Sequence, residues 1–279
     1  MARILAISSQ VARGHVGLSI IVPALQALGH EVIALPSVIL SNHPGHPHCA
    51  GARISLDHLS AMLDALDNNG WLANIDAVLT GYLPSPQHVA FARKAVARVT
   101  AARNGQPLIY LCDPVLGDDP KGLYIDEAAA TAIRDTLIPI ASIATPNRFE
   151  LSFLTGTSIL TAASVFAHPL TGPITVATSI PSNDRGETLN TLISSTAKAV
   201  TRVPLRANVP HGTGDLFSAL LLAARLDGKS LAEALAFATA GVDQTLAKSR
   251  GADELLITAL PTRVEFPLSW PIEQHATPE

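Results

Sequence analysis

Residues 4–36 read ILAISSQVARGHVGLSIIVPALQALGHEVIALP. An apolar run, Ile4–Ser8, precedes an amphipathic stretch, Val16–Leu28, and a second apolar run, Glu31–Pro36, follows it. This strand–helix–strand order is typical of parallel sheets, in which the connecting helices cover the faces of the sheet. The segment therefore predicts an α/β fold with a mostly parallel sheet.

The same alternation continues along the chain. Further apolar runs predict strands at Ala77–Thr80, Leu108–Cys112, Ser142–Thr145 and Ile174–Thr178. Amphipathic stretches predict helices at Leu56–Asp67, Pro86–Ala102, Glu127–Leu137, Phe149–Leu154, Asp215–Leu226 and Leu231–Lys248. An antiparallel hairpin is expected from Thr188–Ser194 and Ala197–Val203, and an edge strand with a loose terminus after Gly251. No linker or repeat interrupts the pattern, so we expect one three-layer α/β/α domain over residues 1–279, with helices on both faces of the sheet.

Composition limits the class of protein. Only 15% of the 279 residues are charged, and 19 lysines and arginines stand against 23 acids. A chain without a basic excess is poorly suited to the nucleic-acid backbone. The longest apolar run, Leu216–Leu226, contains Ser218 and Arg225 and is about half a membrane span. Two cysteines and no evident secretory segment predict a cytoplasmic protein that binds neither nucleic acid nor membrane.

The strongest chemical signal is His211-Gly212-Thr213-Gly214-Asp215, directly before an apolar helix. Glycines there expose backbone N–H groups, and the helix N-terminus adds partial positive charge, which suits a phosphate. Asp215 is placed to take a proton from a hydroxyl group that attacks a phosphoryl group. Read alone, the motif is explained equally well by a Gly-rich turn with an ordinary helix-start acid. The chain has no Walker or dinucleotide-binding glycine pattern.

Two more motifs follow predicted strands. In Cys112-Asp113-Pro114-Val115-Leu116-Gly117-Asp118, the two aspartates lie where open α/β sheets bind ligands, and they suit a cation or a phosphate–metal complex. A Pro–Gly turn with solvated acids is the alternative. In Thr145-Pro146-Asn147-Arg148-Phe149-Glu150, Asn147 and Glu150 share one face of a helix start, which suits Mg²⁺. A capping turn explains this motif equally well.

In this order the motifs resemble the ribokinase superfamily, and within it the pyridoxal kinase branch. The resemblance extends to about residue 250 and also rests on Ser8-Ser9-Gln10-Val11, Gly14-His15-Val16-Gly17, Ser41-Asn42-His43 and Gly81-Tyr82. It implies phosphorylation of the 5′-hydroxymethyl group of pyridoxal, pyridoxine or pyridoxamine by ATP. The alternatives are a hydroxymethylpyrimidine-type kinase of the same superfamily and a non-catalytic vitamin B6-binding protein that retains the fold.

The resemblance also implies roles for individual residues. Asp215 matches the general base, and the backbone N–H groups of Gly212, Thr213 and Gly214 match the anion hole. The implied substrate pocket comprises Ser9, Val16, His43, Tyr82 and Asp215. The implied ATP contacts are Asp113, Asn147, Glu150, Thr178, Ser179, Gly212 and Gly214, and the implied metal ligands are Asp113, Asp118 and Glu150. The expected cofactor is Mg²⁺, with a monovalent cation as a further candidate. Residues 117–124 are expected to close over the nucleotide, and a homodimer is the expected assembly.

Two departures from the family pattern bear on substrate preference and turnover. Pro44 follows Ser-Asn-His where many relatives carry threonine, and the stretch from Thr157 to Gly172 is short for the helix expected there. The side-chain types of His43, His46, His48 and Cys49 suit zinc, but the prolines and glycine among them predict a loop, and the resemblance implies that this loop lies over the substrate ring. We interpret His15 as a packing or hydrogen-bonding residue and Cys112 as an ordinary buried cysteine.

Overall fold

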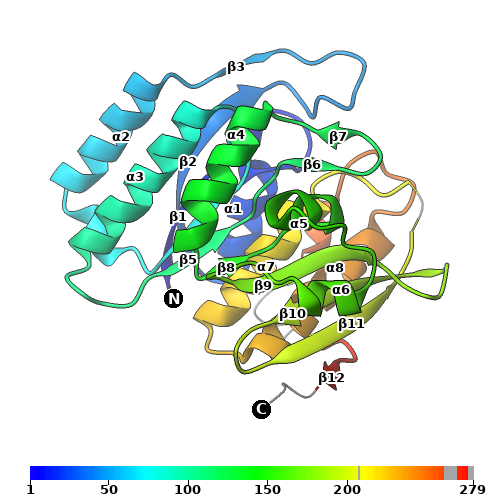
Figure 1. Cartoon of the computed structure of the whole chain (residues 1–279). Helices are drawn as coiled ribbons and strands as arrows, with labels where there is room; N and C mark the ends of the chain where they lie inside the picture. The colour runs from blue at the N-terminus through cyan, green and yellow to red at the C-terminus, as the bar shows by residue number, and fades with distance from the viewer. Residues whose placement is uncertain (207, 261–268, 276–279) are drawn as a thin grey trace.

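The computed structural model describes residues 1–206, 208–260 and 269–275. Its main sheet has a parallel centre of six strands, β1 (Arg3–Val11), β2 (Glu31–Leu40), β4 (Ala77–Thr80), β5 (Ile109–Cys112), β8 (Ile143–Ala144) and β9 (Ile174–Pro181). Antiparallel strands extend both edges, namely β3 (Gly51–Arg53), β10 (Glu187–Ile193), β11 (Lys198–Pro204) and β12 (Glu273–His275). Among the described residues, the order across this ten-stranded sheet is β12-β11-β10-β9-β8-β5-β4-β1-β2-β3 (Figure 1).

Helices cover both faces of the sheet, as predicted. Alternate residues of β1 belong to different cores, with Leu5 and Ile7 on one face and Ile4 and Ala6 on the other. The core of Ile4 and Ala6 packs against α1 (Leu18–Ala27), α7 (Thr213–Leu226) and α8 (Leu231–Lys248). The core of Leu5 and Ile7 packs against α2 (Leu56–Asn68), α3 (Pro86–Ala102), α4 (Glu127–Ala132), α5 (Arg148–Thr155) and α6 (Ala162–Ala167) (Figure 1). The result is the expected α/β/α sandwich.

Several local predictions are confirmed. α3 and α8 have the predicted bounds, and α8 begins with a capping box formed by Ser230 and Glu233. β10 and β11 pair antiparallel, and β12 is the edge strand expected in the tail. The loose terminus expected beyond β12 falls at 276–279, outside the described residues. The short stretch 157–172 holds only the six-residue helix α6.

The structure also corrects two strand predictions. β2 continues past Pro36 to Leu40. β3 pairs only with Val38–Leu40, so at Pro36 one side of β2 has no neighbouring strand. Proline is tolerated at such an edge because no partner strand needs its missing N–H group. The second correction is a small antiparallel sheet, β6 (Gly117–Asp118) and β7 (Gly122–Leu123), within the segment expected to close over the nucleotide, where no strand was predicted. Both strands are too short to show a hydrophobic period.

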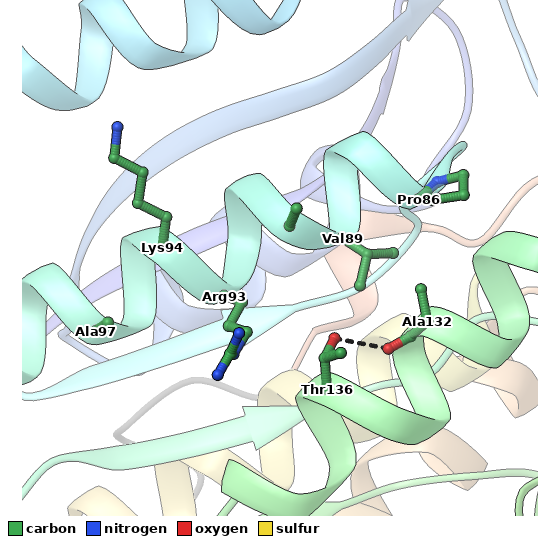
Figure 2. A pocket seen from close by; sticks show the side chains of 8 residues that line it. Pro86, Val89, Arg93, Lys94, Ala97, Ala132 and Thr136 are labelled. Atoms are coloured by element: carbon green, nitrogen blue, oxygen red, sulfur yellow. Dashed lines mark hydrogen bonds between the residues drawn. The ribbon is translucent and has the colours of Figure 1, made fainter.

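A surface groove of about 400 Å³ separates α3 from the helical segment that begins with α4 (Figure 2). Val89 and Arg93 of α3 face Ala132 and Thr136 across it. It includes none of the residues that the sequence analysis placed in the site.

Candidate active site

One glycine allows the turn between β1 and α1 to approach the N-terminus of α7, and a second allows that turn to fold back on the end of β1. Gly212 caps α7 with φ at +101°, and a Cβ atom there would lie 2.0 Å from the carbonyl oxygen of His15. Gly17 has φ at +55°, and its Cβ would lie 2.2 Å from the carbonyl oxygen of Ser9. Only glycine fits such positions without displacing backbone. The Gly-His-Val-Gly and Gly-Thr-Gly-Asp motifs therefore lie side by side.

Asp215, in the first turn of α7, accepts a hydrogen bond from the backbone N–H of Gly17. Its side chain keeps some exposure to solvent, but burial by the surrounding protein raises its pKa to about 6, and the Gly17 hydrogen bond partly offsets that rise. A carboxyl group with this pKa is ionised at neutral pH and still basic enough to accept a proton. Asp215 is thus suited to act as a general base.

The end of β4 closes another side of this space. A Cβ on Gly81 would lie 2.4 Å from Ser8 Oγ and 3.9 Å from Asp215 Oδ1. The Ser8 hydroxyl also accepts the backbone N–H of Tyr82 at 3.1 Å. Tyr82 and Ser9 are half-buried, and Val16 is buried. The predicted pocket residues Ser9, Val16 and Tyr82 therefore flank the segments that hold Asp215.

Asp113 directly follows β5 and is buried. The charges of Asp215 and Glu150 act on its carboxyl group. Burial raises its pKa well above the usual range, and the charges of Asp215 and Glu150 raise it further. Ser218 Oγ donates to Asp113 Oδ2 at 2.8 Å, and Thr145 Oγ1 lies 2.8 Å from Ser218 Oγ. Neither Ser218 nor Thr145 was predicted as a site residue from the sequence. The signal for Ser218 was its position three residues after Asp215, which places both on one side of the helix.

Asn147 and Glu150 form the capping box at the start of α5. Asn147 Oδ1 accepts the N–H of Glu150 at 3.0 Å, and Glu150 Oε2 accepts the N–H of Asn147 at 2.8 Å. Glu150 Oε1 also accepts the N–H of Leu116 at 2.9 Å, while Asn147 Nδ2 donates to the Gly117 carbonyl at 2.8 Å. Burial raises the pKa of Glu150 to about 7, although these backbone N–H groups oppose the rise. The pair therefore fixes the turn that carries Asp113, and any metal at Glu150 would be reached through water.

The predicted metal residues do not form a closed cage. Asp118 is exposed on β6, whereas Asp113 and Glu150 are buried. In the part of the chain that the structure describes, no three His, Cys, Asp or Glu side chains are grouped as a metal site, the loop from His43 to Cys49 included. The raised pKa of Asp113 favours its protonated form, and a cation bound beside it would instead stabilise the carboxylate. This arrangement fits Mg²⁺, which takes one or two carboxylates and completes its shell with water and phosphate oxygens.

The remaining predicted residues lie around these segments. The ring of His43 stacks on His211, with centroids 3.7 Å apart. Thr178 lies within β9, which continues past the predicted strand end to Pro181, and it bridges to Asn147, its N–H donating to the Pro146 carbonyl at 3.0 Å. Ser179 is exposed and adopts a positive φ of 58°. Cys112 is buried, and burial raises the pKa of its thiol to about 12, as expected for a cysteine that is not a nucleophile.

Comparisons with known proteins agree on one family. A family model described as phosphomethylpyrimidine kinase matches residues 52–255. The pyridoxal kinase PdxY of Rubrobacter xylanophilus is 35% identical, covering 98% of this chain and 97% of that protein. The pyridoxine/pyridoxal/pyridoxamine kinase of Bordetella avium is 34% identical, covering 91% of this chain and 88% of that protein.

Solved structures give the same result. The pyridoxal kinase of Leishmania donovani, in complex with ADP and pyridoxamine, superposes with a TM-score of 0.91 at 29% identity, covering 98% of this chain and 99% of the other. The pyridoxal kinase of Entamoeba histolytica gives a TM-score of 0.88 at 26% identity, covering 99% of this chain and 100% of the other. Among the described residues, no helix combines the length and apolar character needed to cross a membrane.

Proposed function

The chain belongs to the pyridoxal kinases of the ribokinase superfamily, and on that premise we propose that its site transfers a phosphoryl group from ATP to the 5′-hydroxymethyl group of pyridoxal, pyridoxine or pyridoxamine. The observation that carries the proposal is Asp215 on the first turn of α7, next to Gly212 and held by the N–H of Gly17. In this arrangement the Asp215 carboxylate and the backbone N–H groups at the start of α7 can act on the same phosphoryl transfer. We place this chemistry in a single domain over residues 1–279.

Asp215 orients the substrate hydroxyl and accepts its proton as the oxygen attacks the terminal phosphoryl group. The N–H groups of Gly212, Thr213 and Gly214, at the start of α7, donate to the transferred phosphoryl group and stabilise the charge that develops on it. Because Gly212 is fixed against His15, these donors are in place before the substrates bind. Positioning and electrostatic stabilisation are the main contributions a protein makes to phosphoryl transfer.

The substrate ring occupies the pocket formed by Ser9, Val16, Tyr82 and the His43 loop. Tyr82 contributes an aromatic face suited to a flat heterocycle, and Ser9 contributes a hydroxyl group for its polar edge. Pro44 provides no hydroxyl, so we assign the polar contacts of the ring to Ser9 and His43. This difference bears on which vitamer is preferred.

The nucleotide lies on the side of Asp113, Asn147 and Thr178, with Ser179 and Glu150 nearby. Residues 117–124 close over it. Mg²⁺ bound at Asp113, with Asp118 and Glu150 reached through water, would neutralise charge on the phosphates. Ser218 and Thr145 hold the Asp113 carboxylate in one orientation toward that position. Closure of the hairpin β6–β7 would exclude water that competes with the substrate as an acceptor.

We also propose a cytoplasmic homodimer, in keeping with the family pattern. Both cysteines are free, which suits a reducing compartment. A monovalent cation as an additional activator belongs to the same proposal and is tested by replacing K⁺ with a large organic cation in the assay.

The test is a substrate panel with MgATP, following ADP release and identifying the product by mass spectrometry. We expect kcat/KM to be highest for a B6 vitamer and lower for hydroxymethylpyrimidine. A preference for hydroxymethylpyrimidine would favour the related kinase activity. Calorimetric binding of pyridoxal with no ADP release for any acceptor would favour a non-catalytic B6-binding protein and overturn the proposal.

A further inference from the structure

The segment from Ser41 to Ala50, here called the histidine loop, is anchored by two side-chain contacts from distant parts of the chain. Hydrogen bonds between Ser41 and Ala50 join its two ends, and Asn42 Nδ2 donates to the carbonyl oxygens of His43 and His48 within it. Most of its residues from Pro44 to Ala50 are exposed. The backbone holds the ends of the loop, because Ser41 also accepts the N–H of Arg13 at 2.9 Å, whereas the exposed middle of the loop is held by the two side-chain contacts described below.

The first anchor is the stack between His43 and His211. The ring centroids are 3.7 Å apart and the rings are inclined by 23°. Gly45 lies against both rings, because a Cβ there would be 2.9 Å from His43 Nδ1 and 3.0 Å from His211 Nε2. Its N–H donates to His43 Nδ1 at 3.0 Å, so in the neutral ring the proton is on Nε2. Burial lowers the pKa of His43 to about 4 and also lowers that of His211, so the stacked rings are uncharged at neutral pH.

The second anchor is Glu254, which follows α8. Its Oε1 lies 3.2 Å from His46 Nε2 and 3.2 Å from Arg13 Nη1. The side chain is only 11% exposed, and it packs on Gly14, where a Cβ would lie 2.6 Å from Glu254 Oε2. The neighbouring Asp253 also pairs with Arg13, at 2.6 Å, but its side chain is 65% exposed. Glu254 thus joins the histidine loop to the turn after β1.

We infer that His211 and Glu254 are positioning residues that hold the histidine loop against the site. This inference rests on the proposed function, in which the loop covers the substrate ring. His211 directly precedes Gly212, the cap of the helix that carries Asp215, so the stack fixes the loop relative to the base. Glu254 fixes the same loop relative to the turn that contains Gly17. Substrate binding to a loop already held in place avoids the cost of ordering it.

The kinetic consequence is a change in KM for the vitamer with little change in kcat. A loosened loop must be ordered by the substrate, which weakens binding, whereas Asp215 and the N–H groups of α7 keep their geometry. His211→Ala removes the stack, and His211→Phe keeps a ring in its place. Glu254→Ala removes the acceptor for His46, and Glu254→Gln keeps one.

The test combines hydrogen exchange at the amides of 41–50 in the free protein with steady-state kinetics. We expect His211→Ala and Glu254→Ala to speed exchange in the loop by about two- to tenfold, the range that a ring pair or comparable contact supports. The KM for pyridoxal should rise by a similar factor, with the KM for ATP unchanged. His211→Phe and Glu254→Gln should restore most of both properties. His168→Ala, an exposed histidine directly after α6, and Asp253→Asn are the matched controls.

Unchanged exchange in 41–50 in both alanine variants would overturn the inference, as would a loss confined to kcat. Because exchange is measured without substrate, this result is independent of the substrate panel. A protein that phosphorylates no vitamer while the alanine variants still loosen the loop would refute the proposed function and leave the anchors established.

Discussion

Replacing Gly212 with alanine should damage both stability and catalysis, and the structure allows the size of the effect to be worked out. A left-handed conformation at φ +101° costs an alanine roughly 1–2 kcal/mol. The added Cβ would also lie 2.0 Å from the His15 carbonyl oxygen, where ordinary contacts begin at 3.4 Å. Relieving this overlap adds roughly 1–3 kcal/mol, so we expect the free energy of unfolding to fall by about 2–5 kcal/mol.

The catalytic loss follows from the same displacement. The turn and the cap of α7 must separate by roughly 1 Å or more, and a misplacement of that size can cost about 10²-fold in rate. We therefore expect kcat/KM for pyridoxal to fall by about 10²-fold or more. Thermal unfolding and ADP release measure the two effects on the same preparation.

Gly214→Ala is the matched control for stability. No atom lies within 4 Å of the position of its Cβ, and its φ is not positive. Alanine is also the better helix former, by up to about 1 kcal/mol. We expect Gly214→Ala to unfold at the wild-type temperature or above. If Gly212→Ala matched the wild type in unfolding and in kcat/KM, the reasoning from the close approach to His15 would be refuted.

Other predictions concern the buried acids. Because the pKa of Asp215 is about 6, kcat/KM should decline as the pH falls through 6, and a flat profile between pH 5 and 8 would contradict its role. Ser218→Ala removes the hydroxyl that holds Asp113 and should raise the Mg²⁺ concentration needed for half-maximal activity; an unchanged Mg²⁺ titration would argue against that role. Glu150→Gln places an N–H₂ group among backbone donors and should lower the free energy of unfolding by about 1–3 kcal/mol, whereas the exposed Glu127→Gln should not. The pKa of Glu150 is raised from 4.5 to about 7, so its contribution to stability is full below pH 4.5 and is lost as the pH rises through 7. Glu150→Gln should remove that part of the pH dependence, which chemical denaturation at several pH values would show.

The sequence predicted the layers of the fold because its strands are buried on both faces and its helices are amphipathic. The end of β2 was predicted too early, at Pro36. A proline ends a strand only where a neighbouring strand needs its N–H group, and the local sequence does not show whether one pairs there. The hairpin at 117–123 had no periodic signal, because each of its strands has two residues.

For the site, the motifs identified Asp113 and Asp215, and the structure brings them within electrostatic influence of each other. The sequence left open whether Asn147 and Glu150 form a capping turn, and the structure shows that they do. Ser218 was hidden in an apolar helix. The contact of Glu254 with His46 joins residues 208 positions apart, and no local pattern predicts such a pair.

The most direct measurement is the turnover of pyridoxal by Asp215→Asn with MgATP, alongside its affinity for pyridoxal by calorimetry. The amide can still accept the Gly17 N–H but is far less basic than the carboxylate. We predict a fall in kcat of about 10²–10⁴-fold, the usual contribution of a general base, with pyridoxal affinity within a few-fold of the wild type. A variant that binds pyridoxal and keeps nearly full kcat would contradict the assignment of Asp215 as the base.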